Sequence, residues 1–250
     1  KSNQSFLSTL FKSEKAEKPI AETEEKNIDG LYQLEVKKYI LDNGLTVILS
    51  KNSKLPLLSF HLFYEVGSKY EYAGITGSSH FLEHMMFKGA KKYARGEFDK
   101  LIEGNGGSTN AYTSYDLTVY HENIPSKALD LVLDIEADRM EYLLLDEGDF
   151  RKEKSVVLEE RKMRYENSAQ GQVYLKSLSK MFEGTPYEVP VIGTIADITN
   201  VPREEVWKFF KTYYAPNNAT LVIAGDIEYE DTIKKIKKHF SSIPASKTVV

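Results

Sequence analysis

The chain has 250 residues, of which 41% are hydrophobic and 28% are charged, and its formal net charge is −4. This balance is ordinary for a globular protein and supplies enough apolar residues for one large domain. The slight acidity argues against a nucleic-acid partner, and the lack of cysteine excludes disulfides and thiolate zinc sites. Since the sequence contains no run of 18 apolar residues, it predicts no transmembrane segment.

The first 30 residues differ in composition from the rest of the chain. They are polar and lack helical or strand periodicity, so we expect residues 1–30 to form a mobile leader and residues 31–250 to form one folded unit. Because the sequence starts at Lys1 rather than Met, we interpret it as a processed or shortened product whose targeting segment has been removed. Such a spacer favours a periplasmic or membrane-tethered protein over a cytoplasmic one.

Strands are predicted early in the folded unit. Residues 39–41 and 45–49 are apolar runs joined by Asp42-Asn43-Gly44, and Asn-Gly supplies the positive φ of a tight hairpin turn. Residues 57–66 are rich in aromatic and β-branched side chains and predict a third strand. Residues 108–124 are also strand-rich, with a bend expected at Asp116.

Helices dominate the predictions for the rest of the chain. They are expected over residues 96–104, 128–145, 150–166, 173–182, 202–214 and 229–240. A further strand is expected at 219–224, and a loop at 186–199. Strands followed by helices, then one more strand and helix, predict an α+β fold: a mixed, mostly antiparallel sheet with helices packed on one face.

The most informative segment is the pentapeptide HFLEH at residues 80–84. On a helix, His80 and His84 lie one turn apart on the same face, about 5–6 Å apart at Cβ, so both imidazoles can bind one metal ion. Glu83 lies beside them, where it can accept a proton from water rather than bind the metal. The alternative is a surface helix with two unrelated histidines.

The helix that carries this segment is predicted to be largely buried, because apolar residues cover its other faces. These residues are Phe81, Leu82, Met85 and Met86. Small residues at 74–79 lead into the helix, and Ser78 or Ser79 is expected to cap its N-terminus.

A catalytic zinc site requires three protein ligands and leaves the fourth position to water. Without cysteine, the third ligand must be a histidine or a carboxylate. The other three histidines, His61, His121 and His239, are more simply explained as structural residues.

The predicted helix at 150–166 offers carboxylates as the third ligand. Glu153 and Glu160 are seven residues apart on one face, close to Val156 and Val157. Acidic and apolar side chains on one face are explained if the carboxylates reach a buried cation; the alternative is a solvated, charged helix. Spacing alone does not choose between Glu159 and Glu160.

The run GSSHFLEHMMFKG, residues 77–89, resembles the zinc motif of the pitrilysin family, the inverzincin metallopeptidases that include mitochondrial processing peptidase. The third ligand of that family is a glutamate about 75 residues beyond the second histidine. Here 160 − 84 − 1 leaves 75 intervening residues, so the resemblance implies Glu160. It also implies that Glu153 orients a ligand.

The likeness extends over about residues 36–245. It includes the segments LDNGL at 41–45, NAYTS at 110–114, ADRM at 137–140 and YAPNNA at 214–219. Ser79 stands where a small apolar residue is common in the family.

The resemblance implies a zinc-dependent endopeptidase that holds one zinc ion and uses Glu83 as the base. It implies that an extended peptide substrate adds as a strand to a sheet edge that contains Asn110 and Ala111. Phe87 is implied as part of a substrate side-chain pocket, and core packing is the alternative role for this ring.

Enzymes of this family are clamshells of two similar halves, each about the length of this chain. The resemblance implies that this chain is the N-terminal, zinc-bearing half. We therefore expect a second half or subunit as a partner, in a homo- or hetero-dimer. The alternative is a zinc-binding, non-catalytic structural subunit, although an intact base and ligand set argue against it.

Overall fold

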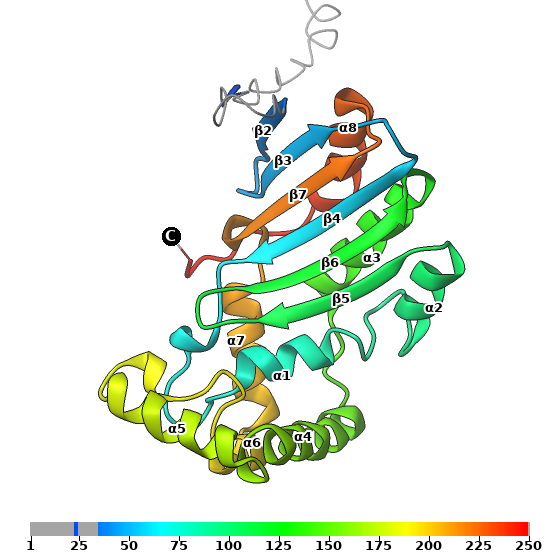
Figure 1. Cartoon of the computed structure of the whole chain (residues 1–250). Helices are drawn as coiled ribbons and strands as arrows, with labels where there is room; N and C mark the ends of the chain where they lie inside the picture. Colours follow the sequence, from blue (N-terminus) through cyan, green and yellow to red (C-terminus); the bar gives the residue numbers. More distant parts are fainter. Residues whose placement is uncertain (1–22, 25–34, 250) are drawn as a thin grey trace, which may run out of the picture.

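The structure, a computed structural model, describes residues 23–24 and 35–249. Its centre is an open sheet of seven strands in the order β1-β2-β3-β7-β4-β6-β5 (Figure 1). The strands are β1 (Thr23–Glu24), β2 (Val36–Ile40), β3 (Thr46–Lys51), β4 (Leu57–Tyr64), β5 (Ser108–Thr113), β6 (Thr118–Pro125) and β7 (Ala219–Gly225). Neighbouring strands are antiparallel, except that β3 and β7 run parallel. The predicted mixed, mostly antiparallel sheet is confirmed.

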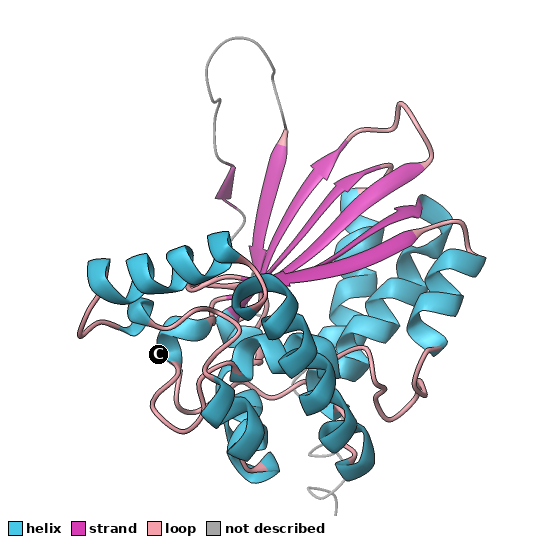
Figure 2. Ribbon diagram, turned by 60° about the horizontal axis from the view of Figure 1, so that its bottom comes forward, coloured by secondary structure: helices cyan, strands magenta, loops and turns pink. Residues whose placement is uncertain are grey.

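One face of the sheet is covered and the other is open. In β4, Leu58, Phe60, Leu62 and Tyr64 are buried, whereas the alternating residues between them are half-exposed. Figure 2 shows the helices gathered on one side of the sheet. They are α1 (Ser78–Met85), α2 (Glu97–Gly104), α3 (Leu129–Tyr142), α4 (Glu147–Arg161), α5 (Ala169–Met181), α6 (Ile195–Asn200), α7 (Arg203–Tyr213) and α8 (Tyr229–Phe240). The predicted α+β architecture is confirmed.

The β2–β3 hairpin turns where the sequence predicts it. Gly44 has φ of 88°, which favours glycine, and a Cβ on it would lie 2.7 Å from Cβ of Asn217. The Asn43 amide donates to the carbonyl oxygens of Phe240 and Ile243, at 2.8 and 3.0 Å. The turn is therefore fixed to the end of the last helix.

Two predicted boundaries are wrong. The expected loop at 186–199 contains the start of α6, whose N-terminus is capped by the Thr194 hydroxyl. Helix α5 begins at Ala169 after a Ser168 cap, four residues before the predicted start at Val173. Gly171 lies inside the helix, where a Cβ would collide with the backbone of Arg164 and Tyr165, so the close approach requires glycine.

Helix α4 also departs from a regular continuation to residue 166. Asp146 caps its start by accepting from the backbone N–H groups of Gly148 and Asp149. After Arg161 the chain continues as a π-helical turn, Lys162–Glu166. The wider turn begins two residues after Glu160, and π-helical turns are frequent at functional sites.

Of the predicted leader, the structure describes Thr23 and Glu24, which form β1 on the edge of β2. The other residues of 1–30 lie outside the described part, so the leader's mobility stays a prediction. Within the described residues, no helix has the length and apolar character needed to cross a bilayer.

Candidate metal centre and active site

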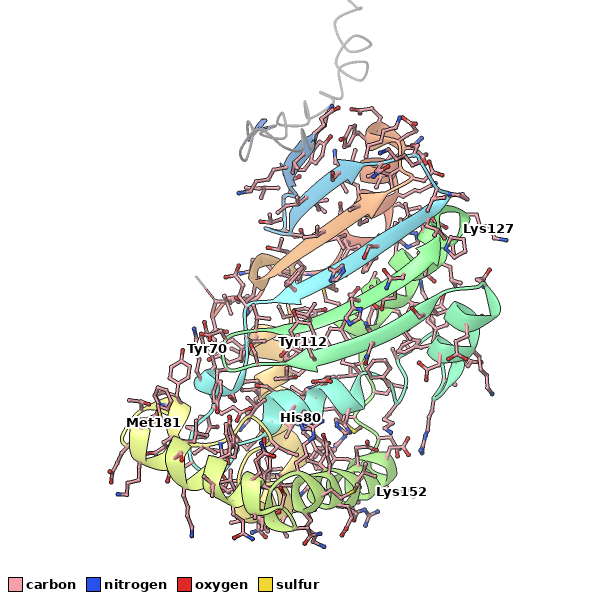
Figure 3. All side chains as sticks on the ribbon, in the orientation of Figure 1. Tyr70, His80, Tyr112, Lys127, Lys152 and Met181 are labelled. Atoms are coloured by element: carbon pink, nitrogen blue, oxygen red, sulfur yellow. The ribbon has the colours of Figure 1, made fainter. Side chains whose placement is uncertain are left out.

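Helix α1 brings the motif to the edge of the sheet. It packs beside the edge strand β5 on one side and beside α4 on the other (Figure 1). Figure 3 labels His80 on α1 and Tyr112 on the neighbouring β5. The motif therefore lies where the last strand of the sheet meets the helical layer.

The predicted serine cap of this helix is wrong. Gly77, with φ of 91°, occupies the N-cap position, and Ser78 and Ser79 are already helical. The Ser78 hydroxyl donates backwards to the carbonyl oxygen of Ile75 at 2.6 Å. The backbone N–H of Ser79 instead donates to the side chain of Glu71, which lies in the preceding loop.

Three side chains converge in the space between α1 and α4. The Oε2 atom of Glu160 lies 3.3 Å from Nε2 of His84 and 3.6 Å from Nε2 of His80. Ligand atoms about 2.0–2.1 Å from one tetrahedral zinc ion are separated from each other by roughly 3.4 Å. The three groups therefore match a zinc ion, and they are the one metal-capable cluster found among the described residues.

The geometry distinguishes Glu159 from Glu160 as the possible third ligand, a choice that sequence spacing leaves open. The Glu159 side chain is exposed and accepts from Lys162 at 2.6 Å, on the outer side of α4. Glu160 turns Oε2 toward the two histidines, and its Oε1 pairs with Arg164 at 2.8 Å. The structure brings Glu160, and not Glu159, to the histidine pair.

Glu153 holds one of the histidines in place. Its Oε1 lies 2.9 Å from Nδ1 of His84, and its Oε2 pairs with Lys88 at 2.8 Å. Although burial raises the pKa of Glu153, the hydrogen bonds with His84 and Lys88 outweigh burial and lower it. An ionised carboxylate at Nδ1 leaves Nε2 of His84 to face the metal position.

Without metal, the pKa values of the two histidines shift in opposite directions. Burial, followed by the neighbouring His84, lowers the pKa of His80 to about 4. Burial also disfavours charge on His84, but its hydrogen bonds to Glu153 and Glu160 outweigh burial and raise its pKa to about 9. At neutral pH and without metal, the His80 ring is therefore neutral and the His84 ring carries the additional proton of an imidazolium.

Zinc binding is accordingly expected to release about one proton at neutral pH and to strengthen as pH rises toward 9. A ligating imidazole must be neutral, so His84 has to lose its proton, whereas His80 is already neutral. The apparent affinity should rise about tenfold per pH unit between roughly pH 6 and 8. Calorimetry in two buffers of different protonation enthalpy measures the proton released; an affinity independent of pH over this range would contradict the assignment.

Glu83 is placed to act as a base. Its side chain is half-buried, and its Oε2 accepts a hydrogen bond from the Thr113 hydroxyl at 2.5 Å. Burial raises the pKa of Glu83, while the bond from Thr113 opposes the rise. Thr113 belongs to the NAYTS segment, but sequence reasoning gave it no role, because its contact with Glu83 depends on how β5 packs on α1.

Of the residues implied in substrate binding, Asn110 and Ala111 lie on the edge strand β5, whereas Phe87 packs against the core. Asn110 is exposed on β5, and its Oδ1 accepts from the backbone N–H of Ala111 at 2.9 Å. β5 is the last strand of the sheet, so its outer side is not paired by a described strand. Phe87 is half-buried, with its ring centroid 6.4 Å from that of Tyr120 and under the guanidinium of Arg139.

The other three histidines lie away from the metal centre. His61 and His121 stack on the open face of the sheet, with ring centroids 5.3 Å apart. His239, on α8, contacts Asp130 and Asp134 of α3 at 3.0 and 3.3 Å. The structure brings none of them to the three-ligand cluster.

Comparison with known families identifies the family to which this chain belongs. Residues 46–195 match Insulinase (Peptidase family M16), and residues 200–249 match the Peptidase M16 inactive domain. The chain belongs to peptidase family M16. The resemblance to the pitrilysin family is thereby confirmed.

The relatives include zinc proteases and a subunit of the cytochrome b-c1 complex. The chain is 37% identical over 204 residues to the zinc protease PqqE of Helicobacter pylori, covering 81% of this chain and 46% of that protein. It is 29% identical over 211 residues to human mitochondrial cytochrome b-c1 complex subunit 1, covering 84% and 43% of the two chains. The chain spans about half the length of the curated relatives that it matches.

Solved structures of related proteases share this fold. A protease from Helicobacter pylori superposes with a TM-score of 0.85 at 34% identity, over 88% of this chain and 53% of that one. The first half of the periplasmic protease PqqL from Escherichia coli superposes with a TM-score of 0.77 at 26% identity, over 86% and 48%. These matches identify the chain's fold as that of an M16 protease half.

Proposed function

We propose that this chain is the zinc-bearing catalytic half of an M16 endopeptidase that hydrolyses extended or unfolded peptides. The observation that carries the proposal is the complete set of side chains between α1 and α4. His80, His84 and Glu160 can hold one zinc ion, and Glu83 lies next to them with its carboxylate fixed by Thr113.

In the proposed reaction, zinc would activate the water and the substrate carbonyl, and Glu83 would transfer the proton. Zinc held by His80, His84 and Glu160 would lower the pKa of a water molecule toward 7 and would polarise the peptide carbonyl. Glu83 accepts a proton from the attacking water at its carboxylate and then donates it to the leaving amine. Thr113 holds Oε2 of Glu83, so that Oε1 is the oxygen free to exchange this proton.

The edge of β5 supports a mode of substrate binding. A peptide added as a strand beside β5 would bond to its backbone, which places little demand on peptide sequence. Asn110 would exchange its contact with the N–H of Ala111 for a contact to the substrate. Phe87 is proposed to contact a substrate side chain with its exposed part.

We further propose that activity depends on a facing half, on the same polypeptide or in a separate subunit, because the relatives are about twice as long. A periplasmic or membrane-tethered location belongs to the same proposal. The structural likeness to a periplasmic protease supports it.

A second candidate is a zinc-binding structural subunit without activity. The likeness to cytochrome b-c1 complex subunit 1 favours it, since that relative is named as part of a complex and not as a protease. The retained Glu83 weighs against it, because a structural zinc site has no use for a base beside the metal.

One experiment separates the two candidates. Metal analysis of the purified protein is expected to give one zinc per chain, and the whole gene product is expected to cleave a fluorogenic, unstructured peptide. Bound zinc with no cleavage of any unstructured peptide would favour the structural subunit. Absence of zinc would contradict both candidates.

A further inference from the structure

The N-terminus of α1 is held by a carboxylate from an earlier loop. Oε2 of Glu71 accepts the backbone N–H of Gly77 at 2.6 Å, and Oε1 accepts the N–H of Ser79 at 2.7 Å. These N–H groups would otherwise have no partner within the helix. A negative charge at this end of a helix is also favoured by the helix dipole.

A second carboxylate fixes the segment that leads into α1. Oδ2 of Asp197, on α6, accepts the Thr76 hydroxyl at 2.5 Å and the backbone N–H groups of Thr76 and Gly74, each at 3.2 Å. The Thr76 hydroxyl in turn accepts the N–H of Thr194 at 3.1 Å. Glu71 and Asp197 thus hold residues 74–79 from two sides.

The same segment is tied to the helix that carries Glu160. The backbones at Gly77 and Gly193 pass very close to each other. A Cβ on Gly77 would lie 2.4 Å from the carbonyl oxygen of Ile192, and a Cβ on Gly193 would lie 2.3 Å from that of Thr76. Nε of Arg161 donates to the carbonyl oxygen of Gly193 at 2.8 Å. Arg161 directly follows Glu160, so a continuous path joins the two ligand-bearing helices without passing through the ligands.

We propose that Glu71 and Asp197 are positioning residues for the metal centre. Neither touches the three ligands. Instead, they fix the first turn of α1, which carries His80, relative to Glu160 on α4. The separation of the ligand atoms is then set by the protein before metal binds. This proposal rests on the zinc site of the proposed function.

The test compares metal binding by Glu71→Gln, Asp197→Asn and a matched control. A glutamine at 71 accepts one N–H but turns its own NH₂ toward the other, so one donor of α1 loses its partner. Glu205→Gln is the control, because Glu205 accepts hydrogen bonds from the Tyr72 hydroxyl at 3.0 Å and from Lys208 at 2.5 Å, and neither partner belongs to α1. Burial raises the pKa of Glu71 to about 7, so the work is done at about pH 8, where the carboxylate is ionised.

Zinc affinity is measured by competition with a chromophoric chelator, and the geometry by the visible absorption of the cobalt(II)-loaded protein. Glu71→Gln and Asp197→Asn are each expected to weaken zinc binding roughly tenfold and to change the cobalt spectrum. Glu205→Gln should leave both unchanged. A purely structural role would lower the stability of the variants and leave the affinity and the spectrum of the folded protein at wild-type values.

Near-ultraviolet circular dichroism identifies the variants that remain folded, and Asp197→Asn provides the test if Glu71→Gln does not fold. If the folded variants had the zinc affinity and the cobalt(II) spectrum of the wild-type protein, Glu71 and Asp197 would not be positioning residues. That result would not contradict the proposed zinc site. A wild-type protein that binds no zinc would instead overturn the zinc site itself.

Discussion

Glu83→Gln is expected to remove peptide cleavage while leaving the metal centre loaded. A glutamine has nearly the same shape as Glu83 and its amide oxygen can still accept from Thr113, but it cannot take a proton from water. Loss of a general base typically lowers the rate by about 10²–10⁴-fold. Glu83 does not belong to the three-ligand cluster, so zinc content should stay at one per chain.

The measurement pairs metal analysis with turnover of an unstructured fluorogenic peptide. Glu159→Gln is the matched control, because it removes an exposed carboxylate directly beside a ligand and should leave turnover near the wild-type value. If zinc-loaded Glu83→Gln cleaved the peptide at the wild-type rate, Glu83 would not be the base.

His80→Ala is expected to remove zinc from the protein. With two ligands left instead of three, affinity should fall by more than about 100-fold, beyond the loss typical for a group that only orients a ligand. The metal-free variant is expected to lose some stability, because the His80 ring is buried, but no ion pair is lost, since a lowered pKa keeps the ring neutral at neutral pH.

Metal analysis after dialysis against a chelator, together with thermal unfolding, tests this prediction. Zinc should raise the unfolding temperature of the wild-type protein, and it should not raise that of His80→Ala. His61→Ala is the control, because that histidine lies on the open face of the sheet and should not affect metal binding. Stoichiometric zinc in His80→Ala would refute the ligand assignment.

The fold could be predicted largely from local patterns. The aromatic and β-branched side chains of residues 57–66 predicted a strand, and the structure has β4 at Leu57–Tyr64. The Asn43-Gly44 turn was found because few residues accept positive φ. The start of α6 was missed because its cap, Thr194, lies in a segment without apolar periodicity, and its position depends on contacts with Thr76.

The sequence by itself determined which residues could carry the chemistry. His80 and His84 share a face because a helix turns once every 3.6 residues, so their pairing follows from the chain alone. The placement of Glu83 beside them follows from the same geometry. The family likeness added the role of Glu160, because 75 residues separate it from His84, as in the zinc motif of the family.

Tertiary structure decided how these residues meet. Glu159 and Glu160 point about 100° apart on α4, so the docking of α4 against α1 selects which carboxylate reaches the histidines. The same packing brings Glu153 to His84 and Thr113 to Glu83. These contacts join residues 30 to 69 positions apart, and no periodicity reports them. Local sequence spacing determines which residues share a helix face. The packing of α1 against α4 and β5 determines which side chains that face contacts.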